Sequence, residues 1–119
     1  MSTRLDPIAL GEWGEEVAAR FLRSKGYQIV GRRIRVGKAE IDILADLAGV
    51  CIIVEVKTVA SDRYGNPEDK LNDRKVQILT NAAEMLLTES PYLELVQFDL
   101  VTIIGHPGKY RMKHWEKAF

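Results

Sequence analysis

The sequence predicts an α/β layered domain, and three observations support this prediction. Apolar residues recur with a helical period in residues 6–26 and again in residues 73–89. Apolar and polar residues alternate, as in β-strands, in the segments between and after these helices. The resulting order is helix, three strands, helix, and one or two strands. A length of 119 residues fits a single domain, spanning 1–119, that can bury a core without disulfide bonds.

The first helix is expected in "DPIALGEWGEEVAARFLRSKG", residues 6–26. Asp6 can cap its first turn, Pro7 suits the first helical position, and Gly26 is expected to end the helix. The apolar face that should pack on the sheet consists of Leu10, Trp13, Val17, Ala18 and Phe21.

Three strands are expected next, in "YQIVGRRIRV" (27–36), "EIDILADL" (40–47) and "VCIIVEVKT" (50–58). Gly31 indicates a bulge in the first of them, and a tight turn at Ala48 and Gly49 joins the other two.

A loop is expected at 61–72 and a second helix at 73–89, with Asp73 as its cap. The chain should end in a strand at 93–104 and a short strand at 109–115. The face of the second helix that should point inward consists of Val76, Leu79, Ala83 and Leu86.

Two acids and a lysine interrupt the apolar strands. Because strand side chains alternate, Glu55 and Lys57 share one face of the third strand. In the second strand, Asp42 lies on the face opposite to that of Ile41 and Ile43. Each strand therefore has one apolar face and one face that becomes charged near its end.

The turn between these strands decides whether the charged residues meet. If Leu47 pairs with Val50, Asp42 lies opposite Glu55 with Cβ atoms about 5 Å apart. A three-residue loop would instead place Val54 opposite Asp42, and the charges would face apolar side chains, which burial disfavours. We therefore expect the two-residue turn, or a longer symmetric one.

Two opposed carboxylates repel each other, so such a pair needs a partner. One carboxyl could keep its proton, or a divalent cation could lie between the two, since oxygen ligands suit Mg²⁺ and Mn²⁺. With Lys57 beside it, such a site could bind a phosphate and stabilise the charge that develops on phosphorus. The alternative is a plain ion pair of a lysine with Asp42 or Glu55 at a sheet edge.

The charges are segregated along the chain although the formal net charge is zero. Residues 17–39 contain seven basic residues and no acid, which favours a basic surface for backbone phosphates, with ordinary solvated faces as the alternative. The candidate nucleic-acid-binding residues in this stretch are Arg32, Arg33, Arg35 and Lys38.

The chain is expected in the cytoplasm, without a membrane partner. The single Cys51 cannot form an internal disulfide and is expected in the core. The first ten residues lack the apolar centre of a signal peptide, and no stretch approaches a membrane span. His106 and His114 lie far along the chain from the acids and are expected on the surface.

The residues "AEIDILA" and "IVEVKT" resemble the active-site signature of the PD-(D/E)XK nuclease superfamily, with 12 residues between the Asp and the Glu-x-Lys. The resemblance implies an αβββαβ restriction-endonuclease-like core, a central mixed sheet flanked by helices. Nearly the whole chain resembles the YraN-like family of small bacterial proteins, related to Holliday-junction resolvases. The matching stretches are "GEWGEEVAARFLRSKGYQIV", "EIDILA", "VEVKT", "SDRYGNP" and "FDLVTI".

The resemblance implies a role for each matching residue. Asp42 and Glu55 match the metal-binding carboxylates, and Lys57 matches the lysine that orients or deprotonates the attacking water. Glu15 matches a helix glutamate that reaches the metal in resolvase-like members, and its helical phase places it beside the apolar stripe. Lys75 or Gln77 matches a polar residue near the scissile phosphate.

Two positions depart from the usual pattern of the resembled family. Relatives commonly have Gly where this chain has Ala39, which puts a positive-φ turn at that position in doubt. They commonly have Asn where this chain has Arg33, which would add a phosphate contact or remove a hydrogen bond.

The resemblance implies an Mg²⁺- or Mn²⁺-dependent endonuclease that hydrolyses phosphodiester bonds in DNA. The intact set of Asp42, Glu55 and Lys57 favours this function over its alternative, a nucleic-acid-binding module that keeps the fold without efficient catalysis. Resolvases cut two strands symmetrically, so a homodimer is possible, although no exposed apolar stripe in the sequence demands one.

Overall fold

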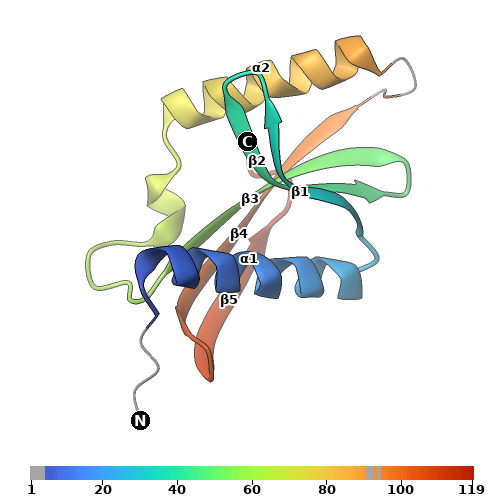
Figure 1. Ribbon diagram of the computed structural model, residues 1–119. Helices are drawn as coiled ribbons and strands as arrows, with labels where there is room; N and C mark the ends of the chain where they lie inside the picture. The colour runs from blue at the N-terminus through green and yellow to red at the C-terminus, as the bar shows by residue number, and fades with distance from the viewer. Residues whose placement is uncertain (1–4, 91–92, 94) are drawn as a thin grey trace.

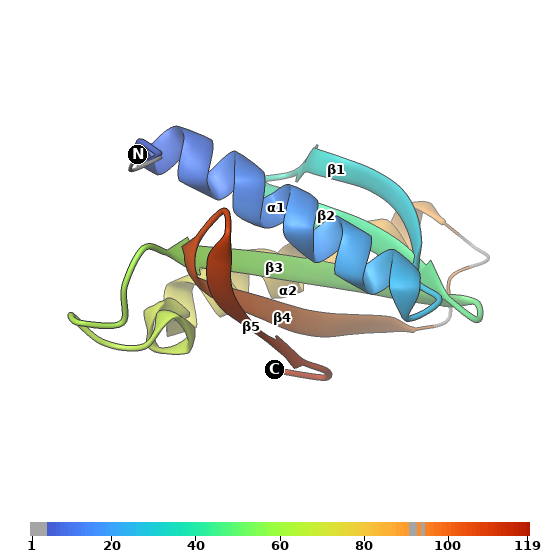
Figure 2. The ribbon, with the colours of Figure 1, turned by 90° about the horizontal axis from the view of Figure 1, so that it is seen from below.

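The computed structural model describes residues 5–90, 93 and 95–119, which form a five-stranded mixed sheet with a helix on each face (Figures 1 and 2). The strands follow one another across the sheet in chain order, and only β3 and β4 are parallel neighbours. The expected mixed sheet between helices is thus confirmed. The helices are α1 (Pro7–Ser24), the short 3-10 helix η1 (Pro67–Lys70) and α2 (Asp73–Glu89), and the strands are β1 (Gln28–Val36), β2 (Ala39–Leu47), β3 (Val50–Val59), β4 (Val96–His106) and β5 (Lys109–Trp115).

Helix α1 begins and ends as expected, but its buried face is rotated. The Asp6 carboxylate accepts a hydrogen bond from the backbone N–H of Ala9 at 2.8 Å, and Gly26 follows the helix with a φ of 91°. The predicted stripe residues Trp13, Val17 and Phe21 are only partly buried. The buried line consists of Gly14, Glu15, Ala18, Ala19 and Leu22.

The rotation of α1 follows from the size of Gly14. A Cβ atom at this position would overlap with the Thr58 side chain of β3, so only glycine allows the helix to approach the sheet this closely. The close approach also carries the neighbouring Glu15 toward the sheet, where it is 7% exposed.

Replacing Gly14 with alanine is therefore expected to destabilise the protein by about 1–3 kcal/mol, because overpacking forces the helix away from β3. Gly11 is the matched control, since a Cβ there would meet nothing within 4 Å. Gly11→Ala should be neutral or stabilising by up to about 1 kcal/mol, because alanine favours the helix. Urea unfolding of both variants measures the difference, and equal stabilities would contradict the close-packing account.

The expected register of β2 and β3 is confirmed. Leu47 pairs with Val50, and the antiparallel ladder continues without a shift to Ile43 and Val54. The turn residues Ala48 and Gly49 have φ values of 51° and 88°, as a two-residue turn that matches strand twist requires. The next residues beyond the ladder are Asp42 and Glu55.

In the β1–β2 hairpin, the side chains that point to each face of the sheet change at Arg33 and Asp42. Arg33 has a φ of 52°, in the left-handed region, and regular pairs flank it on both sides. We expected Ile41 and Ile43 on one face, but Ile41 packs in the core under α2 whereas Ile43 packs in the core under α1. The expectation is therefore wrong, and the change of face falls at Asp42, which lies opposite the left-handed Arg33 in the hairpin. The bulge expected at Gly31 is present, because the register shifts between Ile29 and Gly31.

Helix α2 has the expected bounds but a different cap. The side chain of Asn72, rather than Asp73, accepts a hydrogen bond from the backbone N–H of Lys75 at 2.9 Å. Asp73 instead lies within the first turn, where a negative charge is also favourable. The preceding loop contains η1, which the sequence analysis did not anticipate. The buried residues of α2 are Leu79, Ala82 and Ala83.

The C-terminal hairpin corrects the expectation for His114. Its side chain is 4% exposed, and its Nε2 lies 2.7 Å from Oδ2 of the fully buried Asp99. Antiparallel pairing of β4 and β5 places His114 opposite Val101, so a residue distant in sequence reaches the core. His106 is exposed, as expected, and Cys51 is buried. Glu94, at the start of the expected fourth strand, lies outside the described residues.

Over the part of the chain that the structure describes, neither helix is long and apolar enough to cross a membrane.

Candidate functional site

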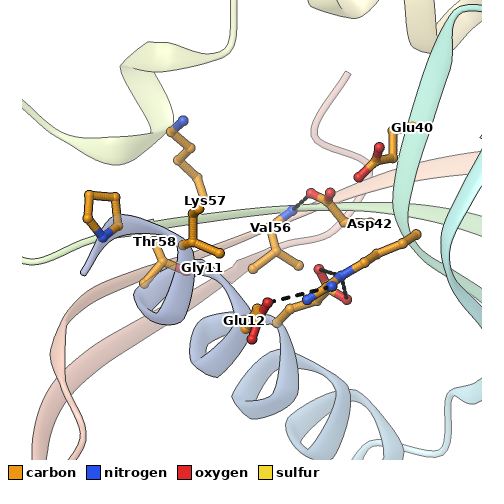
Figure 3. Close-up of a pocket in the computed structure, with 11 residues that line it drawn as sticks. Gly11, Glu12, Glu40, Asp42, Val56, Lys57 and Thr58 are labelled. Carbon is orange, nitrogen blue, oxygen red and sulfur yellow. Dashed lines mark hydrogen bonds and ion pairs between the residues drawn. The ribbon is translucent and has the colours of Figure 1, made fainter. Parts of the chain in front are cut away.

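At the end of the β2–β3 ladder, the Asp42 carboxylate accepts a hydrogen bond that a backbone carbonyl would accept in a regular ladder. Its Oδ2 accepts a hydrogen bond from the backbone N–H of Val56 at 2.8 Å (Figure 3). The last regular pair of the ladder joins Ile43 and Val54. The two strands therefore separate where the side chains of Asp42 and Glu55 begin, and the separation opens space beside both carboxyls.

Glu55 is the more strongly perturbed of the two acids. Its side chain is 12% exposed, and its Oε2 is buried without a hydrogen-bond partner among the described residues. Burial and the nearby Asp42 carboxylate together raise the pKa of Glu55 to about 8. Burial also raises the pKa of Asp42, against the opposing effect of the Val56 hydrogen bond. Lys75 offers partial compensation, since its Nζ lies 3.6 Å from Oε1 of Glu55.

Glu15 reaches the same region from α1 but is already neutralised by two arginines of β1. Nε of Arg32 lies 3.0 Å from Oε1 of Glu15, and Nε of Arg33 lies 3.3 Å from the same oxygen. Arg32 also forms an ion pair of 2.6 Å with Glu16. Glu15 could therefore approach a metal only by giving up contacts with these guanidinium groups.

The predicted nucleic-acid-binding cluster is largely engaged within the protein. Arg32 and Arg33 pair with acids of α1, and Arg35 pairs with Glu40 at 3.4 Å. Lys38 is exposed and has no ion pair within the described ranges. The positive charge of Arg32 and Arg33 holds α1 to β1, which leaves less of it for phosphate groups.

Two cavities adjoin the carboxyl pair. The first, of about 480 Å³, lies between the start of α1 and the β-hairpin, and its polar lining includes Glu12, Glu15, Asp42 and Lys57 (Figure 3). The second, of about 150 Å³, includes Glu55 and Lys57 in its lining. Lys57 thus lines both cavities, and Figure 3 shows its ammonium group extending away from Asp42.

The alternatives Lys75 and Gln77 are separated by their contacts. Lys75 lines the second cavity and pairs with Glu55. Gln77 is exposed, and its side-chain amide donates to Asn81 on the next turn of α2 at 2.9 Å. Of the two, Lys75 is the residue that reaches the carboxyl pair.

Sequence reasoning missed two further residues of the second cavity, Lys70 and Asn72. Both lie in the loop expected at 61–72, although Pro67 and the Asn72–Asp73 pair are typical signals of helical turns and caps. These signals could have placed Lys70 at the end of a short helical turn, shortly before the start of α2.

The residues present fit a hard divalent cation held by Asp42 and Glu55. No group of three or more His, Cys, Asp or Glu side chains that could hold a metal occurs in the described part of the chain. Mg²⁺ does not require such a group, because it commonly binds one or two carboxylates and keeps water or substrate phosphate as its other ligands. The buried Oε2 of Glu55, which has no hydrogen-bond partner among the described residues, would supply one such oxygen.

A carboxyl pair at the open end of a hairpin, within a mixed sheet that carries a helix on each face, defines an α/β domain compatible with a nuclease-like core. The model of the family described as "Uncharacterised protein family UPF0102" matches residues 14–103. The chain therefore belongs to this family, which confirms the family-level resemblance, whereas the nuclease superfamily stays a prediction.

Relatives of similar length support this membership. A UPF0102 protein of Syntrophomonas wolfei is 39% identical over 111 residues, covering 92% of this chain and 96% of the relative. A UPF0102 protein of Phocaeicola vulgatus is 38% identical over 109 residues, covering 92% and 90%. UPF0102 protein TTHA0372 of Thermus thermophilus is 36% identical over 104 residues, covering 87% and 91%.

Proposed function

We propose that this protein is a metal-dependent endonuclease of the PD-(D/E)XK type that hydrolyses phosphodiester bonds in DNA. The observation that supports the proposal best is the pair of Asp42 and Glu55, two partly buried carboxyls with raised pKa values, of which Asp42 lines the first cavity and Glu55 the second. A pair of this kind is costly for folding alone, and perturbed acids in a cavity are typical of functional sites.

Asp42 and Glu55 would hold Mg²⁺ or Mn²⁺, which would supply charge stabilisation and a more acidic bound water. Lys57 would orient or deprotonate the attacking water, and Lys75 would contribute positive charge near the phosphate. Glu15 would act from the wall of the cavity, and the cluster of Arg32, Arg33, Arg35 and Lys38 would contact backbone phosphates. The proposal includes a cytoplasmic location, and it is compatible with a homodimer that cuts two strands.

Cleavage of a panel of branched, duplex and single-stranded DNA with Mg²⁺ or Mn²⁺ tests this proposal. Glu55→Gln is expected to lower the cleavage rate at least about 100-fold, because it removes a charge that stabilises the transition state. Glu84→Gln, at an exposed position of α2, should cut like wild type. Equal cutting by both variants would point to a contaminating nuclease and would reject the site.

One observation favours a second candidate function, a nucleic-acid-binding module with little or no catalysis. Nζ of Lys75 lies 3.6 Å from Oε1 of Glu55, so this acid already has a positive charge beside it without a metal. This alternative predicts that the protein binds members of the same panel with and without metal. It also predicts that isothermal titration gives the same result with Mg²⁺ for wild type and for Glu55→Gln, because no Mg²⁺ binds at Glu55.

A further inference from the structure

The second cavity has a chemistry distinct from that of the first. It lies between η1, the start of α2 and the interior of β3 and β4, where Glu55, Lys57 and Leu100 line it, whereas Asp42 and Glu15 do not. Its polar lining consists of Glu55, Lys57, Lys70, Asn72 and Lys75.

The lining of this cavity carries an excess of positive charge. Lys75 is 3.6 Å from Glu55, the only acid that lines the cavity, so Glu55 balances at most one of the three lysines. Lys57 and Lys70 have no ion pair with any acid of the described residues. Two ammonium groups are therefore left to attract an anion into the cavity.

The start of α2 adds to this attraction. The first turn of a helix presents backbone N–H groups that lack partners within the helix, and its dipole favours negative charge. Asn72 caps α2 and lines the cavity, which places this end of the helix at the cavity wall. Asp73, the acid of the first turn, does not line the cavity.

The size of the cavity selects a small anion. A volume of about 150 Å³ is well below the roughly 300–1,000 Å³ of pockets that enclose larger ligands. A phosphoryl group fits such a volume, whereas an entire nucleotide does not. Leu71, Pro67 and Leu100 supply an apolar part of the lining, so an anion would lose water on one side and depend on the lysines.

We propose that this cavity is a phosphate subsite, which binds a phosphate group of the substrate other than the one that is attacked. The inference rests on the proposed function only in taking a nucleic acid as the source of the phosphate. Lys57 lines both cavities, so it would contact the two phosphates from between them. The source is either a terminal phosphate monoester or the next internal diester of the same strand.

Binding of inorganic phosphate to the metal-free protein tests the subsite directly, followed by NMR of backbone amides. Wild type is expected to show saturable shifts in residues 70–75, and Lys70→Gln should weaken phosphate binding roughly three- to tenfold through loss of one charge-assisted contact. Lys109→Gln, at an exposed position of β5 far along the chain from the cavity, is the matched control and should bind like wild type. Equal effects of the two substitutions, or shifts that do not saturate, would overturn the subsite.

Duplexes that end in a 5′-phosphate, a 3′-phosphate or hydroxyl groups then identify the source. A preference for one phosphorylated end that Lys70→Gln removes assigns the subsite to a terminal monoester. Equal weakening of all three duplexes by Lys70→Gln, with no change by Lys109→Gln, assigns it to an internal diester. Because phosphate titration requires neither metal nor cleavage, failure of the proposed nuclease activity would leave the subsite standing, and the reverse also holds.

Discussion

The metal-free protein is expected to become more stable, rather than less, when Glu55 is replaced by glutamine. Glu55 is 12% exposed, its Oε2 lacks a partner among the described residues, and its pKa is raised to about 8 by burial and by Asp42. Since one pKa unit corresponds to about 1.4 kcal/mol, keeping this carboxyl in its buried position costs on the order of a few kcal/mol at alkaline pH. Glutamine keeps the shape of the side chain and has no charge to bury.

The stabilising effect of Glu55→Gln should depend on pH. Between the ordinary Glu pKa of 4.5 and about 8, the folded protein retains a proton on Glu55 that the unfolded chain has released. The folding free energy therefore becomes less favourable as the pH rises through this window, and Glu55→Gln should lack this loss. The advantage of the variant should be small near pH 4, should grow as the pH rises toward 8, and should level off above about pH 8.

Thermal and urea unfolding at several pH values, with and without Mg²⁺, measures both parts of the prediction. Mg²⁺ should stabilise wild type, because a ligand that binds only the folded state raises stability, and it should have little effect on Glu55→Gln. Glu84→Gln should follow wild type at every pH. A Glu55→Gln variant that is less stable than wild type at pH 8 without metal would contradict the reading of Glu55 as a functional residue that strains the fold.

The features of this site that depend on local backbone geometry could be predicted from the sequence. Strand alternation and a two-residue turn are short-range properties, so the register that brings Asp42 next to Glu55 could be predicted from Leu47, Ala48 and Val50. The bounds of α2 and β5 followed in the same way from periodicity and turn residues.

Contacts between distant segments could not be predicted in this way. A left-handed Arg33 carries no sequence signal, because arginine is not a residue that favours positive φ, so the irregular pairing opposite Asp42 and the change of face at Ile41 could not be predicted. The neutralisation of Glu15 by Arg32 depends on how closely α1 approaches the sheet, which in turn depends on Gly14. Basic residues that look available in the sequence are thus partly used for packing.

Replacing Asp99, a buried acid outside the candidate site, is expected to cause the largest loss of stability. It is completely buried and accepts hydrogen bonds from the Tyr27 hydroxyl and the Gln97 amide, both at 2.8 Å, and from the backbone N–H of Lys117 at 3.2 Å. Nε2 of His114 lies 2.7 Å from its Oδ2. Asp99→Ala removes the shared acceptor of these groups and leaves the Tyr27 hydroxyl only its longer hydrogen bond to Glu116, at 3.3 Å, so we expect a loss of about 3–5 kcal/mol in the free energy of unfolding.

The same carboxylate should contribute to unfolding in acid. Burial alone would raise the pKa of Asp99, but hydrogen bonds from Gln97, Tyr27 and His114 outweigh it and hold the pKa below its ordinary value of 3.8. A lowered pKa in the folded state provides stability that is fully present above pH 3.8 and is lost as the pH falls through the folded value. Asp99→Asn keeps the size of the side chain but lacks this titration, so its stability should change less with pH below 3.8.

Urea unfolding of both variants between pH 2 and pH 7 checks these expectations, with Asp62→Ala as the control. Asp62 forms an exposed ion pair of 2.9 Å with Arg111, and removing such a pair typically costs less than about 1 kcal/mol. If Asp99→Ala is no less stable than Asp62→Ala at pH 7, the network around Asp99 does not hold β5 to the body of the sheet. If instead only Asp99→Ala unfolds readily, Asp99 stabilises the packing of the C-terminal hairpin on the sheet. The neighbouring strands β4 and β3 would then carry one carboxylate that stabilises the fold, Asp99, and one that destabilises it, Glu55.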